Sequence, residues 1–273
     1  MREFNLKIEN ALKVDSSAGN LLKWCIKDSN NNTLYIKTST FNEYNSIWLY
    51  ESYSELIVCR LLKDLGITNV VMYYPCKINL NNGVSTFGCY SKSFLGNNEK
   101  YISIANLVKT GKVIDTYSFE GYEGYERCIK DIGTVCGIDY RNELDKIIEV
   151  DYLTLNCDRH LGNLGFIYNY RTAKFNIAPI FDNGNALFSL KDISEMDYST
   201  ALDSYVTSKP FYNRHEMQVR MISEKIDFRY NIDKTLKYID SLKSLGLDKH
   251  RAEFIKQLLK IRLKMLYDKN NSI

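Results

Sequence analysis

Short apolar runs separated by turn-forming clusters recur in the first third of this chain. The runs come in two pairs, 21–27 with 33–37 and 70–80 with 84–90. An Asp-Ser-Asn-Asn-Asn cluster separates the first pair, and Asn81-Asn82-Gly83 separates the second. Turn-forming clusters between apolar runs, and Asn-Gly above all, are typical of β-hairpins. The pattern therefore predicts two hairpins, and Lys37 ends a strand of the first.

A helical pattern lies between these two pairs. From about residue 50 to residue 65 the apolar side chains recur every three or four positions, and Gly66 follows as a stop signal. Glu55 falls within this predicted helix. The first part of the chain therefore reads as strands, one helix and further strands.

Helical periodicity dominates the rest of the chain, at 101–109, 121–135, 139–156, 212–224, 232–244 and 247–267. One more hairpin is expected there, because apolar runs at 164–168 and 174–178 flank an Asn-Tyr-Arg-Thr turn. We therefore predict an α+β fold with two lobes, a small β-rich lobe at 1–92 and a larger, mainly helical lobe at 93–273.

Composition excludes several classes of protein. The 273 residues are 45% hydrophobic and 25% charged, near the average of soluble globular proteins, which excludes wholesale disorder, collagen and a membrane bundle. A formal net charge of +3 is too small to imply an anionic partner, so we expect no direct binding of nucleic acid. No stretch reaches the roughly 18 uninterrupted apolar residues of a spanning helix, and residues 1–13 lack the apolar core of a signal peptide. We expect neither membrane insertion nor secretion by the usual route.

The seven cysteines point to a reducing environment. They show no CxxC or Cys/His metal spacing, and an odd number cannot be fully paired within the chain. Because disulfides are rare in reducing compartments, we expect the protein in the cytoplasm.

The candidate chemistry lies in an ordered set of polar residues that follows the helix predicted at 139–156. Asp158 and Asn163 belong to an Asp-Arg-His-Leu-Gly-Asn segment, and Asp182 follows after the hairpin. Phosphoryl transfer needs a carboxylate that orients the acceptor hydroxyl, an amide that ligates Mg²⁺ and a second carboxylate on the metal. Asp158, Asn163 and Asp182 fit these roles in that order. Gly184 is expected to allow a tight turn beside the metal.

A short polar motif of this kind is also found in loops that merely cap a helix. The upstream residues favour the catalytic interpretation. Lys37 on a predicted strand and Glu55 on the next predicted helix match the lysine and glutamate pair that holds the ATP phosphates in kinases. Either residue alone would most often be a solvated surface charge. Coincidence is a poor explanation for the ordered series, in which each residue lies on the expected type of element: Lys37, Glu55, Asp158, Asn163 and Asp182.

The chain resembles the HipA-like serine/threonine kinases, the toxin kinases of bacterial toxin–antitoxin modules. Residues 155–165, Leu-Asn-Cys-Asp-Arg-His-Leu-Gly-Asn-Leu-Gly, and 177–182, Ile-Ala-Pro-Ile-Phe-Asp, resemble the family's catalytic loop and its alanine-proline-x-x-aspartate segment. Segments 16–23, 34–37 and 54–67 resemble its phosphate loop, nucleotide lysine and glutamate helix. The resemblance covers about residues 14 to 190.

The resemblance implies a bilobed kinase-like fold, the cofactors ATP and Mg²⁺, and a protein substrate with a serine or threonine acceptor. It also implies that backbone N–H groups around Ser17, Ala18 and Gly19 cradle phosphate. Family members often phosphorylate a serine of their own phosphate loop, for which Ser16 and Ser17 are the candidates here. Both serines would equally serve to form a turn with Gly19.

The chain departs from the family at its amino terminus. Full-length members carry an additional subdomain before the phosphate loop, and only residues 1–13 precede it here. We therefore expect a short form that either acts without this subdomain or finds it on a separate small protein. A toxic activity and an antitoxin partner are two further properties that the resemblance implies.

Several neighbouring residues keep two interpretations. Arg159 could neutralise a phosphate or form an ion pair with a helical carboxylate, and His160 is more often a scaffold residue than a proton shuttle. Cys157 is by default an inert buried thiol. Tyr90, near the junction of the predicted lobes, could help to bind adenine or simply belong to the core.

Two alternative functions remain. Kinases of small molecules or lipids use related carboxylates, and fold does not choose the acceptor. The modest charge argues against a lipid acceptor, and the lack of an evident acidic carboxy-terminal pocket argues against an aminoglycoside. A non-catalytic regulatory pseudokinase that binds a nucleotide or partner is the alternative of another class. The complete set of catalytic residues argues against it.

Overall fold

The computed structural model describes residues 1–12, 21–113, 121–192, 196, 206–222 and 231–271. The chain divides into two compact units, each built from three segments. The first unit comprises Met1–Phe94, Asp182–Met196 and Asn231–Lys256, and the second comprises Leu95–Phe181, Asp197–Tyr230 and Gln257–Ile273. The division expected at residue 92 concerns functional lobes and stays a prediction, whereas these units are defined by packing and are interrupted along the chain.

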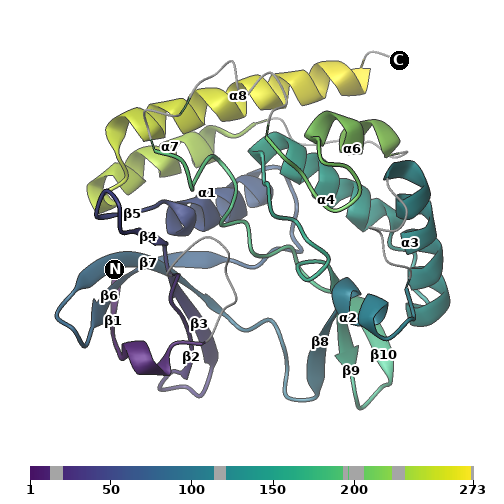
Figure 1. Cartoon of the computed structure of the whole chain (residues 1–273), viewed down its shortest axis with the longest axis horizontal. Coiled ribbons are helices and arrows are strands. Elements are labelled where there is room, and N and C mark those ends of the chain that lie inside the picture. Colours follow the sequence, from purple (N-terminus) through teal and green to yellow (C-terminus); the bar gives the residue numbers. More distant parts are fainter. Residues whose placement is uncertain (13–20, 114–120, 193–195, 197–205, 223–230, 272–273) are drawn as a thin grey trace. The chain divides into compact units, whose positions relative to one another are not determined.

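A five-stranded sheet is the centre of the first unit (Figure 1). Its order is β1-β6-β7-β3-β2, with β1 parallel to β6 and the other pairs antiparallel. The strands are β1 (Arg2–Leu6), β2 (Lys23–Lys27), β3 (Thr33–Thr38), β6 (Tyr73–Leu80) and β7 (Ser85–Lys92). The expected hairpins are thus β2–β3 and β6–β7.

The two faces of this sheet carry different side chains, because neighbouring residues of a strand point to opposite sides. One face is an apolar core made of Phe4, Leu6, Trp24, Leu34, Ile36, Cys76, Ile78 and Leu80. The other face packs against helix α1 (Glu51–Asp64), which contacts β3, β6 and β7. On this second face Tyr53 of α1 stacks on Phe87 of β7, with ring centroids 4.3 Å apart. Lys37 belongs to the same face.

The later segments of the first unit pack around α1. Helix α7 (Asp233–Leu242) contacts α1, and Arg251 at the start of α8 (Lys249–Asn271) is fully buried. The Arg251 guanidinium lies 3.7 Å from the centre of the Tyr50 ring and donates to the carbonyl oxygens of Phe188, at 3.1 Å, and Lys191. Arg251 therefore ties the segment that follows Asp182 to the beginning of α1. The remaining elements among the described residues of this unit are η1 (Ile8–Asn10), η4 (Lys243–Leu245) and the short hairpin β4 (Phe41–Asn42) with β5 (Ile47–Trp48).

The second unit is mainly helical. Its helices are α2 (Ile104–Lys109), α3 (Gly121–Cys136), α4 (Arg141–Thr154), α6 (His215–Met221) and the later part of α8. Helix α6 contacts both α3 and α4. A three-stranded antiparallel sheet, in the order β10-β9-β8, completes the unit with β8 (Glu99–Ser103), β9 (Gly165–Asn169) and β10 (Lys174–Ile177).

The structure confirms the α+β class, and four strands among the described residues differ from expectation, namely β1, β8 and the short pair β4 and β5, for which no apolar run was found. The helix expected at 101–109 begins only at Ile104, because Ser103 caps it and residues 99–103 pair with β9 as strand β8. The reciprocal side-chain and backbone bonds of Ser103 and Asn106 form a capping box. Strand β1 was not expected, because no turn signal links it to a neighbouring run and its partner β6, with which it pairs in parallel, is remote in the sequence.

In the described part of the chain, no helix is long and apolar enough to cross a membrane. All seven cysteines lie in the described residues and are free thiols.

Candidate functional site

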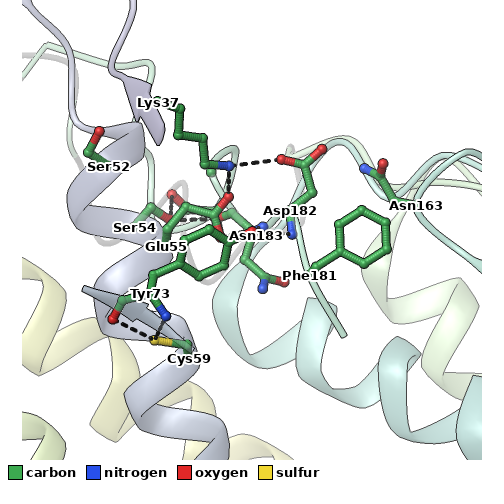
Figure 2. A network of polar contacts seen from close by, with 12 residues as sticks. Lys37, Ser52, Ser54, Glu55, Cys59, Tyr73, Asn163, Phe181, Asp182 and Asn183 are labelled. Atoms are coloured by element: carbon green, nitrogen blue, oxygen red, sulfur yellow. Dashed lines mark hydrogen bonds and ion pairs between the residues drawn. The ribbon is translucent and has the colours of Figure 1, made fainter. Parts of the chain in front are cut away.

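Three of the expected residues meet in the first unit. The Lys37 ammonium of β3 forms an ion pair with the Glu55 carboxylate of α1 and a second with Asp182, whose Oδ1 lies 3.0 Å from Nζ. Figure 2 shows the ammonium directed at both carboxylates. Lys37 and Glu55 are buried, whereas the Asp182 side chain is 34% exposed. The network therefore has a buried part, formed by Lys37 and Glu55, and one partly exposed carboxylate, that of Asp182.

The charge on Lys37 is stabilised by its acidic neighbours. Burial opposes the charge, but Glu55, Tyr73 and Asp182 together hold the pKa of Lys37 well above its ordinary value. The ammonium also lies 5.1 Å from the centre of the Tyr73 ring, within the range of a cation–π contact. Lys37 is therefore a permanent cation, which is the state that an anionic ligand requires.

Strand register explains why Lys37 reaches α1. Lys37 pairs with Cys89 of β7, on the face of the sheet that α1 covers. The backbones of β3 and β7 can approach there because Gly88 has no side chain. A Cβ atom on Gly88 would lie 2.7 Å from the carbonyl oxygen of Lys37, closer than real contacts allow. Gly88 therefore helps to fix the position of the Lys37 backbone relative to β7.

Helix α1 also holds the backbone that follows Asp182. The second Glu55 oxygen, Oε2, accepts a hydrogen bond from the Asn183 N–H at 2.9 Å. The Ser54 hydroxyl lies 2.7 Å from the Asn183 carbonyl oxygen and 3.0 Å from that of Ala186. A single turn of α1 therefore orients both Lys37 and the residue after Asp182.

Asp182 itself has a left-handed backbone, with φ of 58°. Non-glycine residues adopt this conformation rarely, and such strain concentrates at functional sites. The Asp182 N–H points to the Tyr73 hydroxyl, which accepts at 3.4 Å. Gly184 lies in a turn, as expected, in which the Ala186 N–H donates to the Asn183 carbonyl oxygen at 3.3 Å, and the position of this turn beside a metal stays a prediction. A Cβ on Gly184 would meet Glu51 and Glu55 only at ordinary contact distances of 3.4 and 3.6 Å.

The loop that the sequence predicts to be catalytic lies in the second unit, where it begins directly after α4. The helix ends at Thr154 and is capped by Leu155, which has a left-handed backbone with φ of 52°. Asn156 turns back and donates from Nδ2 to the Asp151 carboxylate at 3.1 Å, while its Oδ1 accepts from the Asp158 N–H at 3.2 Å. A fully buried amide thus sets the position of Asp158 relative to α4.

Arg159 is a structural residue of this loop. Its guanidinium is buried, and it donates two hydrogen bonds to the Asp151 carboxylate and one, of 2.7 Å, to the Phe181 carbonyl oxygen. Of the two interpretations of Arg159 that the sequence allowed, the ion pair with a helical carboxylate is the one observed. The pair holds the loop against α4 and against the residue that precedes Asp182.

The neighbours of Asp158 also have scaffold contacts. His160 Nδ1 accepts a hydrogen bond from the Gly162 N–H at 3.1 Å, as expected of a scaffold histidine. Burial raises the pKa of the Cys157 thiol, so Cys157 is a poor nucleophile. Asp158 is different, because its carboxylate is 36% exposed and forms an ion pair with Lys209.

The expected metal ligands have suitable chemistry. Asn163 is buried, and its Nδ2 lies 3.4 Å from the Asp158 carbonyl oxygen, which leaves Oδ1 as the amide atom able to ligate a cation. No three His, Cys, Asp or Glu side chains gather into a metal-binding group within the described residues. One carboxylate and one amide instead fit Mg²⁺, which commonly takes few protein ligands and completes its shell with phosphate oxygens and water.

Tyr90 is not part of the Lys37 network. It pairs with Ile36 and Tyr74 inside the sheet, and its ring packs against the apolar core and against Phe4, with centroids 5.4 Å apart. This is the face opposite to Lys37. The Tyr90 ring is therefore part of the apolar core, and a role of this residue in binding adenine stays a prediction. Ser16, Ser17, Ala18 and Gly19 lie outside the described residues.

Four residues of these networks were missed by sequence reasoning, namely Tyr73, Asp151, Asn183 and Lys209. Asp151 carried a usable signal, because it lies two turns before Arg159 at the end of a predicted helix. Asn183 follows Asp182 directly. Tyr73 and Lys209 reach the site from distant segments, and no local pattern indicates their contacts.

No family model matches the chain, and the search of curated proteins gave no significant match. Among solved structures, the proinflammatory kinase CtkA of Helicobacter pylori is similar to it, with a TM-score of 0.65 and 18% identity over 94% of this chain and 92% of CtkA. The chain has a kinase-like fold. The α+β architecture expected from the sequence is thereby confirmed as that of a kinase-like protein.

Two further solved structures are similar at a lower level. The Golgi casein kinase with Mn and ADP bound has a TM-score of 0.47 and 13% identity, over 97% of this chain and 74% of that one. HipA of Shewanella oneidensis MR-1, in complex with HipB and operator DNA, has a TM-score of 0.48 and 13% identity, over 96% of this chain and 65% of HipA.

Proposed function

We propose that this protein is an ATP- and Mg²⁺-dependent protein kinase whose acceptor is a serine or threonine hydroxyl. The observation that carries the proposal is the network of Lys37, Glu55 and Asp182. It holds a permanent cation beside a partly exposed carboxylate, in a chain whose fold is kinase-like. A buried ion pair costs much desolvation and is weak evidence of a stabilising role, so a role in binding explains it better.

Each residue has a separate task in this proposal. Lys37, oriented by Glu55, binds the α and β phosphates of ATP, and Asp182 and Asn163 hold Mg²⁺. The metal, when bound, neutralises the charge of the phosphate oxygens. Asp158 accepts a hydrogen bond from the acceptor hydroxyl and orients its oxygen for in-line attack on the γ-phosphorus. Ser17, Ala18 and Gly19 are proposed to contact phosphate through their backbone.

The test is incubation of the purified protein with γ-labelled ATP and a cell lysate, with Mg²⁺ or with excess EDTA. We expect Mg²⁺-dependent label on protein, at serine or threonine. Label on small molecules or lipids alone would favour the alternative kinase, and the absence of any transfer would favour a regulatory pseudokinase. Mapping the label tests whether Ser16 or Ser17 is modified.

The family resemblance also motivates a proposal about partners. A toxin role would require that growth arrest follows expression of the wild-type chain and is lost on substitution of Asp158. An antitoxin, or a small protein that supplies the additional amino-terminal subdomain, would then be recovered by co-purification and would restore growth. Growth that is unaffected by the wild-type chain would contradict the toxin role without affecting the proposed kinase activity.

A further inference from the structure

Lys209 forms an ion pair with the residue proposed to orient the acceptor hydroxyl. Its Nζ lies 2.8 Å from Asp158 Oδ1, and both residues belong to the second unit. The Lys209 side chain is 44% exposed and that of Asp158 36%, so a ligand can reach both. The pair thus places a cation at the exposed side of the catalytic loop.

The backbone of Lys209 is held by buried hydrogen bonds. Gln218 of α6 is 1% exposed; it donates from Nε2 to the Lys209 carbonyl oxygen at 2.8 Å and accepts from the Phe211 N–H at 3.2 Å. Next to it, the buried Ser208 hydroxyl donates to the Tyr212 carbonyl oxygen at 2.8 Å. The backbone of Lys209 is therefore held in place by buried hydrogen bonds, unlike that of an ordinary surface lysine.

Stability does not explain this arrangement well. Ion pairs between solvent-exposed side chains contribute little to folding, because water screens the attraction and two long side chains lose conformational freedom. A backbone clamped by a buried amide is, however, what orientation of a functional side chain requires. The way in which Gln218 holds the Lys209 backbone therefore favours a role of Lys209 in the proposed reaction.

We propose that Lys209 is a further catalytic residue, which binds the equatorial oxygens of the phosphoryl group during transfer. This inference rests on the proposed kinase function. In the step, a bond forms between the acceptor oxygen and the γ-phosphorus, and the bond from that phosphorus to the bridging oxygen breaks. ADP leaves with the bonding pair, and the acceptor proton passes to Asp158. Lys209 keeps its own protons throughout.

The charge of the transferred group explains why a cation is needed at this position. The transition state is loose, and its negative charge is spread over three equatorial oxygens. When Asp158 binds the acceptor hydroxyl, the oxygen of that hydroxyl lies next to the attacked phosphorus. The Lys209 ammonium, which is paired with the Asp158 carboxylate, is then separated from the equatorial oxygens of the phosphoryl group only by this hydroxyl. Preorganised cations of this kind stabilise the transition state more than the ground state.

The test compares binding of ADP with binding of ADP plus aluminium fluoride, which imitates the phosphoryl group in transfer, by calorimetry in the presence of Mg²⁺. For Lys209→Met we expect unchanged affinity for ADP alone and a loss of about 10²-fold in affinity for the aluminium fluoride complex. The turnover number should fall by a similar factor with little change in the KM for ATP. Lys209→Arg, which keeps the charge, should lose less in both measurements.

Lys146→Met is the matched control, because Lys146 forms an ion pair of 2.9 Å with Glu143 on α4 of the same unit. It should bind both ligands as the wild type does. A Lys209→Met variant with wild-type affinity for the aluminium fluoride complex would overturn the proposal, and so would one with increased turnover, which would mean that Lys209 blocks Asp158. Equal losses in Lys209→Met and Lys209→Arg would overturn it too. A wild type that binds ADP but neither binds the analogue nor transfers phosphate would instead refute the proposed kinase function.

Discussion

Arg159 donates two hydrogen bonds to the carboxylate of Asp151, 2.9 Å from Nε to Oδ2 and 3.0 Å from Nη2 to Oδ1. Both side chains are buried. Through its remaining nitrogen Arg159 binds the carbonyl oxygen of Phe181, the residue before Asp182. One ion pair thus connects the end of α4 with the loop that carries Asp158 and with the segment that leads to the proposed metal ligand.

Replacing Asp151 with Asn should therefore be strongly destabilising. The change leaves the buried Arg159 guanidinium without its counter-charge, which typically costs about 3–5 kcal/mol of unfolding free energy. Urea denaturation followed by circular dichroism measures it. The control is Glu123→Gln, which breaks the exposed pair of Glu123 with Arg127 and should cost less than about 1 kcal/mol. Equal costs for both variants would contradict the structural role of the pair.

Replacing Glu55 with Gln should impair the handling of ATP. The amide keeps the size of the side chain, but it removes the charge that orients Lys37. We expect phosphoryl transfer to fall about 10²-fold or more, with a raised KM for ATP. Glu51→Gln makes the same change one turn earlier on α1, at another buried carboxylate, and should keep most of the activity. Steady-state kinetics with varied ATP separates the two variants, and similar losses in both would count against the assigned role of Glu55.

The parts of the fold that the sequence predicts are those with local signals. The β2–β3 and β6–β7 hairpins carry turn residues between apolar runs, and helix α1 carries a helical apolar pattern that ends at a glycine. Strand β1 could not be predicted, because its partner β6 is remote in the sequence and its pairing is parallel. The start of α2 at Ile104 depends on the cap at Ser103 and on pairing with β9, which periodicity does not reveal.

The residues of the site can likewise be divided into those that a sequence pattern indicates and those that it does not. Lys37, Glu55 and Asp182 could be selected from their order along the chain and the element expected for each, and the structure brings them together. Their roles, with those of Asp158 and Asn163, stay predictions. The contact of Lys209 with Asp158 and that of Tyr73 with Asp182 depend on tertiary packing, so no sequence pattern could indicate them.

Acid should destabilise the second unit through His215. Its ring is buried, neither ring nitrogen has a hydrogen-bond partner among the described residues, and burial together with the nearby Arg262 lowers its pKa to about 3. The unfolded chain therefore binds a proton near pH 6.5 that the folded protein does not bind. Stability present above pH 6.5 is thus lost as the pH falls toward about 3.

Between pH 7 and pH 5 this difference amounts to about 2 kcal/mol of unfolding free energy. Urea unfolding at the two pH values measures it. His215→Leu, which cannot take up the proton, should lose less stability over this interval than the wild type. The assignment fails if the two proteins lose the same amount.

The most direct test of the account is phosphoryl transfer by Asp182→Asn. Asp182 is partly exposed, and the substitution keeps its size, so the thermal unfolding midpoint should stay close to that of the wild type. If Asp182 holds the metal, transfer from γ-labelled ATP in the presence of Mg²⁺ should be abolished in this variant and retained in the wild type. A folded Asp182→Asn protein that transfers phosphate at the wild-type rate would contradict the proposed kinase mechanism.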